Sequence, residues 1–269
     1  MSAKTPPAAR PWIERLARLG YAAKGVVYLL LGWLAASAAR GIGDVPSGSR
    51  EVFSVVLAKP LGRAMLAAIA LGLAGYVLWR VVAAIADAQG KGSDPKGLAV
   101  RGYYLGSAAV HTALVVAALR LLVGHGAAGG GDRTPTQTAK LMAQPFGRWL
   151  VGIVGLLVLV AAARQVQLAL GKYRKKVRVD RVPARARPWV GPIVGFGLIA
   201  RAVVFTIIGG FLLRAALHRD PHEAKGLAGA LRTVEAQPAG VWLLGVLAAG
   251  LAAYGVFQLL EARYRTIRP

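Results

Sequence analysis

The chain contains no cysteine and few acidic residues, with only eleven aspartates and glutamates among 269 residues. The absence of cysteine excludes a disulfide-stapled domain, a zinc–thiolate site and a cysteine nucleophile. Only 17% of the residues are charged, whereas 56% are hydrophobic and the mean hydropathy is +0.51. A soluble globule of this size needs more polar side chains to cover its surface, but a chain solvated by lipid does not. The composition therefore indicates an integral membrane protein.

Six apolar stretches are long enough to cross a bilayer as helices, which takes about 20 residues each. They lie near residues 20–39, 64–86, 103–123, 149–170, 193–217 and 241–260. Helices are expected because lipid offers no partner for unpaired backbone groups and the alternation of barrel strands is missing. The predicted fold class is an all-α membrane protein with six transmembrane helices and both termini on one side.

Lysine and arginine predict which side that is. Eighteen of the 34 lie in the two tails and in the second and fourth connections, twelve lie on the opposite side, and four interrupt the spans. The positive-inside bias therefore predicts cytoplasmic N- and C-termini. The densest basic run, residues 172–187, also has the composition that attracts anionic lipids at a membrane surface. Nucleic-acid binding is not expected, because no folded module or interleaved base-stacking aromatic residues accompany this run.

The first and fifth spans repeat one another. A shift of 177 residues places Gly20 on Gly197, Lys24 on Arg201 and Tyr28 on Phe205. The start of the first span also has the basic and then apolar composition of a secretory signal peptide. Because a signal peptide has no reason to recur as an internal span, we expect the first span to remain in the protein.

The even spans carry a second repeated feature, an Ala-x-Pro-x-Gly motif at their start. It occurs at residues 58–62, 143–147 and 236–240. Proline is expected in the first turn of each of these helices, where its missing N–H is tolerated. A short interfacial turn or helix is expected just before each motif.

The two repeated features divide the single membrane domain, residues 1–269, into three units. The units are residues 10–90, 95–175 and 187–265. Each unit crosses the membrane twice, so all three enter it in the same direction and an axis relating them runs along the membrane normal. The prediction is three parallel two-helix repeats in a pseudo-three-fold arrangement, with the even spans forming much of the inner packing. The middle unit differs, because Gly102-Tyr103 matches Gly20-Tyr21 but Gly106 stands where Lys24 and Arg201 stand.

The sequence resembles domain-of-unknown-function family 1206 in these same features. The resemblance rests on the opening at residues 18–28, the second-helix motif at residues 237–245 and the Gly-rich segment 250–255. It implies a multi-pass protein of the bacterial inner membrane. It brings no catalytic residue, cofactor or substrate.

Four cations interrupt the spans, namely Lys24, Arg80, Arg164 and Arg201. At 1.5 Å per residue they lie about 6, 9, 9 and 12 Å from the cytoplasmic ends of their spans. The first three are close enough to snorkel to the headgroups. Arg201 is deeper, and a central unpaired arginine costs about 2.5–3.5 kcal/mol on insertion scales. The alternative is that all four line a cytoplasmic vestibule that holds a lipid phosphate or a small anion.

No aspartate or glutamate lies inside the six stretches, so a buried Arg201 needs another kind of partner. The candidates are helix carbonyls, a glutamine such as Gln165, Gln167 or Gln258, water, or a bound anion. The lack of acids also disfavours proton-driven transport, since only His111 is available to titrate within a span.

The remaining chemistry is sparse. His218 and His222 have the spacing of a helical metal pair, but Pro221 lies between them and breaks that geometry, so a solvated loop is expected. No nucleophile, base and orienting group stand at a recognisable spacing. The sequence therefore predicts a non-enzymatic protein without a cofactor or metal.

Two functional classes remain open. The first is a structural or interaction protein whose basic cytoplasmic face holds anionic lipid, a membrane protein partner or a second copy. The second is a channel or transporter for a small solute or anion along the repeat axis.

Overall fold

The computed structural model describes residues 11–46, 48–124, 132–175 and 177–265. Over these ranges the chain forms helices and a single isolated bridge between Val177 and Arg265. The long helices are α1 (Pro11–Ala39), α3 (Gly62–Ile85), α4 (Pro95–Leu122), α6 (Gly147–Ala169), α7 (Arg187–His218) and α9 (Gly240–Tyr264). The short α-helices are α2 (Ser49–Leu57), α5 (Thr134–Met142) and α8 (Leu227–Glu235). Short 3₁₀ turns, η1 (Lys172–Lys175), η2 (Val179–Arg181) and η3 (Pro221–Glu223), lie in the connections.

The all-helical prediction is confirmed. In the described ranges six helices are long and apolar enough to cross a membrane, and they coincide with the six predicted stretches. One helix boundary differs from the prediction in a way that adds a charged residue. Helix α9 continues past residue 260 to Tyr264 and so includes Glu261. Helix α9 thus carries a carboxylate that the predicted stretch left out.

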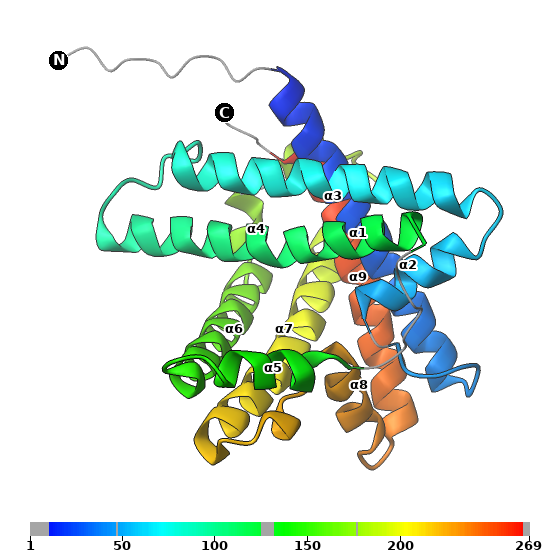
Figure 1. The fold of residues 1–269 in the computed structure, drawn as a ribbon. Helices are drawn as coiled ribbons and strands as arrows, with labels where there is room; N and C mark the ends of the chain where they lie inside the picture. The colour runs from blue at the N-terminus through cyan, green and yellow to red at the C-terminus, as the bar shows by residue number, and fades with distance from the viewer. Residues whose placement is uncertain (1–10, 47, 125–131, 176, 266–269) are drawn as a thin grey trace.

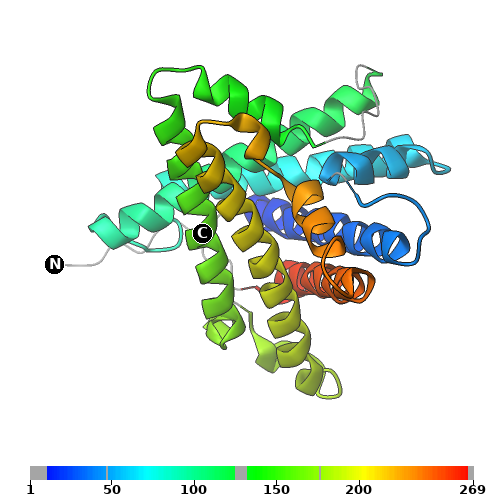
Figure 2. The ribbon, with the colours of Figure 1, turned by 90° about the horizontal axis from the view of Figure 1, so that it is seen from below.

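The long helices pack mainly across the boundaries between units. The close pairs are α1 with α9, α3 with α4, and α6 with α7 (Figure 1). Within the first and third units, α1 also packs on α3 and α7 on α9. In the middle unit α4 and α6 do not pack along one another, and they run across each other at a steep angle in both views (Figures 1 and 2). The helices therefore form an open row from α4 through α3, α1, α9 and α7 to α6, and the pseudo-three-fold arrangement stays a prediction.

Each unit contains one of the short helices α2, α5 and α8, followed by the same turn. The turn places Leu61, Phe146 and Ala239 in the left-handed region, at φ 60°, 60° and 59°. The glycine that follows each of them begins the next long helix. The short helices predicted before the motifs are therefore present.

The role expected for the motif proline is wrong. Pro60 lies in the turn, two residues before α3 begins at Gly62, and not in the first helical turn. Steric contact with the backbone requires a glycine at the last position of the motif. A Cβ on Gly62 would lie 2.3 Å from the carbonyl oxygen of Val56, and one on Gly240 would lie 1.7 Å from that of Glu235. Since neither backbone oxygen can move easily, only glycine fits these turns.

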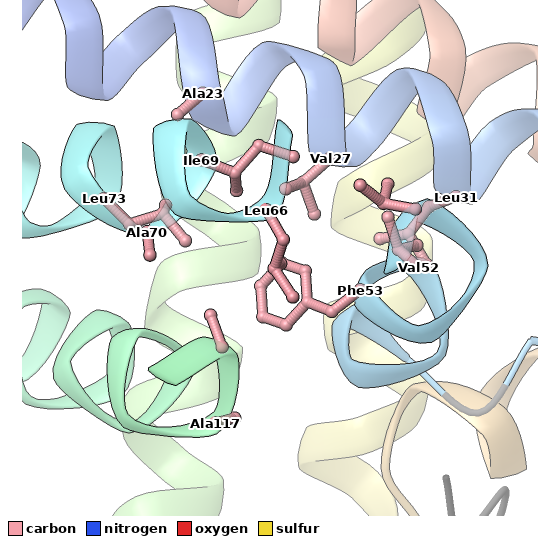
Figure 3. Packing of buried hydrophobic residues seen from close by; sticks show 12 residues of the cluster. Ala23, Val27, Leu31, Val52, Phe53, Leu66, Ile69, Ala70, Leu73 and Ala117 are labelled. Carbon is pink, nitrogen blue, oxygen red and sulfur yellow. The ribbon is translucent and has the colours of Figure 1, made fainter. Parts of the chain in front are cut away.

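The short helix α2 contributes directly to the core. Phe53 of α2 is fully buried and lies next to Leu66 of α3, with Val27 and Leu31 of α1 on one side and Ala117 of α4 on the other (Figure 3). This cluster joins the first unit to the first helix of the middle unit.

The prediction that the even spans form the inner packing holds for two of them. Buried residues make up 56% of the apolar window of α3 and 50% of that of α9, but only 22% of that of α6. The prediction is therefore wrong for α6, because its partner α4 lies apart from it. Helix α1, an odd span, is as buried as α9.

A candidate anion site of buried cations and aromatic rings

Three of the four predicted cations come together inside the helix row. Lys24 on α1, Arg80 on α3 and Arg201 on α7 are 7%, 8% and 8% exposed, and we call them the cation cluster. Contacts with the rings of Tyr76 and Tyr254 link the three side chains to one another. The snorkelling interpretation does not describe Lys24 or Arg80, because both side chains are covered by protein.

Aromatic rings surround the cation cluster. The Lys24 ammonium lies 5.1 Å from the ring centre of Tyr76 and 5.8 Å from that of Tyr254. Tyr76 also faces the Arg80 guanidinium at 5.0 Å, and Tyr104 faces it at 4.9 Å. Each cation–π contact of this kind contributes about 0.5–2 kcal/mol, with the larger values in desolvated places.

Arg201 has the most complete aromatic surround. Its guanidinium carbon lies 4.1 Å from the ring centre of Phe205, 4.7 Å from that of Tyr254 and 5.6 Å from that of Tyr28. Tyr254 thus lies between Lys24 and Arg201, just as Tyr76 lies between Lys24 and Arg80. The three cations and two tyrosines form one continuous alternating array.

Direct hydrogen bonds satisfy only part of the array. Arg80 Nε donates to the Tyr76 hydroxyl at 2.8 Å, and Arg201 Nε donates to the Tyr28 hydroxyl at 2.9 Å. The terminal guanidinium nitrogens of both arginines and the Lys24 ammonium donate to no residue in the described ranges. In the same part of the chain, no carboxylate lies within ion-pairing distance of the cation cluster. Buried charges are normally paired, so the cation cluster is a candidate position for binding an anion.

Close helix contacts position the two central tyrosines. A Cβ on Gly20 of α1 would lie 2.5 Å from Cβ of Tyr76, and one on Gly197 of α7 would lie 2.3 Å from the backbone nitrogen of Tyr254. Lys24 follows Gly20 by one helical turn, and Arg201 follows Gly197 by the same spacing. In both units the glycine therefore brings a cation next to a tyrosine of the partner helix.

Arg164 lies apart from the cation cluster. It is exposed on α6 and donates from Nη1 to Gln167 at 3.0 Å. The vestibule hypothesis grouped four cations, and the structure brings together only three of them. The snorkelling interpretation fits Arg164, whose side chain is not enclosed by the described protein.

The sequence does not identify the hydrogen-bond partner of Arg201, which is the Tyr28 hydroxyl. Gln167 hydrogen bonds with Arg164 instead, and the buried amide of Gln258 has no hydrogen-bond partner among the described residues. The internal repeat does, however, reveal other buried aromatic and polar positions of the site. When the units are aligned on Gly62, Gly147 and Gly240, the position fourteen residues later holds Tyr76, Ala161 and Tyr254. The position eighteen residues later holds Arg80, Gln165 and Gln258, all of them buried.

A second charged group lies at the C-terminal end of α9. Glu261 and Arg265 form a buried ion pair, and Arg265 also lies over the Tyr21 ring at 4.9 Å. Arg18 of α1 donates to the carbonyl oxygens of Ala262 and Arg263, both at 2.7 Å. This group is internally paired, in contrast to the cation cluster.

The histidines take the positions expected for ordinary structural groups. His111 Nδ1 hydrogen bonds with the Ser107 carbonyl oxygen at 2.7 Å, and its ring packs 4.6 Å from that of Tyr76. His218 pairs with Glu223 at 2.9 Å in the connection after α7. Among the described residues, no group of three histidines or carboxylates could hold a metal ion.

A comparison with known protein families finds one family that matches this chain. The family model described as Domain of Unknown Function (DUF1206) matches residues 19–87, 103–172 and 196–265, once in each repeat. The chain belongs to the DUF1206 family. The three DUF1206 matches lie within or close to the three predicted units and together cover most of the chain.

A curated protein is similar to the chain over most of its length. The protein named "Uncharacterized protein YxxB" from Bacillus subtilis (strain 168) is 37% identical over 259 residues, which cover 95% of this DUF1206 chain and 92% of the relative. No solved structure shows significant similarity to the chain. The comparisons thus support a multi-pass, membrane-type helical protein with internal repeats.

Proposed function

We propose that this DUF1206 protein is a non-catalytic protein of the bacterial inner membrane that binds the anionic headgroup of a phospholipid at the cation cluster. The observation that supports the proposal most is the set of three buried cations, Lys24, Arg80 and Arg201, without a carboxylate partner in the described chain. Phosphate oxygens would accept from the terminal guanidinium nitrogens and from the ammonium, which are the donors that the protein leaves over.

A lipid phosphate fits the position of the site as well as its charge. Counted from the cytoplasmic ends of the apolar stretches predicted from the sequence, the three cations lie about 6–12 Å deep. The basic run 172–187 belongs to the same side and would raise the local concentration of anionic lipid. A headgroup drawn slightly below the surface would leave its acyl chains in the apolar layer.

The direct test is the lipid that remains on the purified protein. We expect native mass spectrometry to show phosphatidylglycerol bound to the wild-type protein, and the retained fraction to fall about tenfold in Arg201→Gln. A factor of ten corresponds to about 1.4 kcal/mol, close to the lower end of the contribution of one hydrogen bond to a charged group. Arg148→Gln is a matched control, because Arg148 also lies over an aromatic ring, that of Trp149 at 4.7 Å, outside the cation cluster.

Two further arms of this experiment separate the alternatives. Titration with inorganic phosphate in place of lipid tests for a free anion, and phosphate flux into liposomes tests the channel or transporter class. Retention of phosphatidylglycerol by the protein, without phosphate flux into liposomes, supports the proposal. Phosphate flux that Arg201→Gln abolishes, or lipid retention that Arg201→Gln leaves unchanged, would overturn it.

A further inference from the structure

The middle unit is built differently from its neighbours in a way that bears on access to the cation cluster. In the first and third units, the two long helices pack closely through Gly20 against Tyr76 and Gly197 against Tyr254. The middle unit keeps the equivalent glycine, Gly102, but a Cβ added there would meet no atom within 4 Å. Helices α4 and α6 accordingly cross at a steep angle instead of packing along one another (Figures 1 and 2).

The residue that Gly102 would face in a closed unit is also small. By the alignment on the motif glycines, the counterpart of Tyr76 and Tyr254 on α6 is Ala161. A glycine and an alanine at these positions let two helix backbones approach closely in a membrane. The middle unit therefore has the side chains for the closed packing, while its helices lie in an open arrangement.

The open side borders the cation cluster. Tyr104, the aromatic partner of Arg80, belongs to α4, and so does His111, whose ring packs 4.6 Å from that of Tyr76. Apolar side chains are exposed on both helices, among them Val110 on α4 and Leu157 on α6, at 62% and 60%.

We infer that α4 and α6 form a lateral gate through which a phospholipid headgroup reaches the cation cluster from the bilayer, and that the gate closes by packing Gly102 against α6. The inference rests on the proposed function for its ligand, but the gate itself rests on the comparison between units. A lipid suits this route because Arg164 meets its phosphate at the proposed cytoplasmic level and the exposed apolar faces meet its acyl chains.

The lack of cysteine makes the gate directly measurable. Spin labels at Leu98→Cys and Leu170→Cys report on the cytoplasmic ends of α4 and α6, where both side chains are well exposed. A second pair, Trp189→Cys and Arg263→Cys, reports on α7 and α9, which are packed. In nanodiscs we expect two distance populations for the first pair and one for the second.

Two substitutions distinguish the gate from general helix motion. Gly102→Leu fills a position that is glycine in all three units, so it is expected to remove the short-distance population while leaving the fold intact. Gly106→Leu is the matched control. It also enters open space, but its counterparts are Lys24 and Arg201, so a side chain there is compatible with closure.

The outcomes separate the gate from its ligand. A single long distance in the wild type, or a short population that survives in Gly102→Leu, would overturn the gate. Phosphatidylglycerol is expected to enrich the open population in the wild type and to lose that effect in Arg201→Gln. If two populations are present but lipid does not shift them, the lipid assignment fails and the gate remains.

Discussion

At the scale of single residues, the notable feature is how Arg201 is accommodated in a membrane-spanning helix. Its Nε has a tyrosine hydroxyl as acceptor, its faces have three aromatic rings, and its remaining donors are the ones assigned to the proposed anion. The sequence predicts that such an arginine needs a partner, because the cost of leaving it unpaired is known. It does not predict that the partner is Tyr28, since that contact joins residues 173 positions apart.

Substitution of Tyr28 by phenylalanine tests the hydrogen bond separately from the ring. Tyr28→Phe keeps the cation–π contact and reproduces the residue that the third unit carries at this position, Phe205. We expect a loss of about 1.5 kcal/mol of stability, the lower end for a hydrogen bond to a charged group. The midpoint of thermal unfolding in detergent measures it. Tyr28→Leu, which also removes the ring, should cost more, and equal effects of both variants would contradict the role assigned to the hydroxyl.

At the scale of elements, the repeated turn between each short helix and the next long helix is the best-determined feature. Its motif is visible in the sequence, but the reason for its glycine is visible only in three dimensions. The glycine meets the last carbonyl oxygens of the preceding short helix, whereas the left-handed residue before it makes the reversal.

The turn makes a sharp prediction for glycine substitutions in α9. Gly240→Ala should destabilise the protein by about 1–3 kcal/mol, as overpacking does, because its Cβ would collide with the Glu235 carbonyl oxygen. Gly245→Ala in the same helix should be neutral or slightly stabilising, since no atom lies within 4 Å of the added Cβ. Thermal unfolding of the two variants in the same detergent makes the comparison, and similar melting temperatures would contradict the assignment.

The connection between α3 and α4 should be sensitive to acid. Backbone N–H groups of Lys91 and Gly92 donate to the Asp87 carboxylate, both at 2.7 Å, and lower the pKa of Asp87 below its usual value. Because the folded-state pKa is depressed, the stabilisation is complete above the unfolded-state value of about 4 and is lost as the pH falls through the folded-state value. Asp87→Asn should therefore lower the melting temperature at pH 7 and differ progressively less from the wild type below about pH 4. A difference that does not change with pH would rule out this role.

At the scale of the whole molecule, hydropathy, charge and repeats predict the six helices and their division into three units. These features are local or periodic, so they can be read along the chain. The order in which the helices pack cannot be read along the chain in this way. It depends on which small residues meet across units, and the separation of α4 from α6 leaves no signal in Gly102, which looks the same as Gly20 and Gly197 in the sequence.

The same reasoning explains the partial success with the candidate site. Four cations inside apolar spans are readily found, but Lys24, Arg80 and Arg201 converge because Gly20 and Gly197 bring their helices against Tyr76 and Tyr254. Arg164 belongs to the open unit, where no such contact is made within the described chain, and it stays outside. Closure of the unit would bring it nearer to the cluster.

The central claim is that the cation cluster holds a phosphate group. A cryo-electron microscopy map of the protein in phosphatidylglycerol nanodiscs, at a resolution that shows ordered lipid, tests it most directly. The account predicts phosphate density within hydrogen-bonding distance of Lys24 and Arg201, and its loss in Arg201→Gln. Density for water alone between the three cations would contradict it.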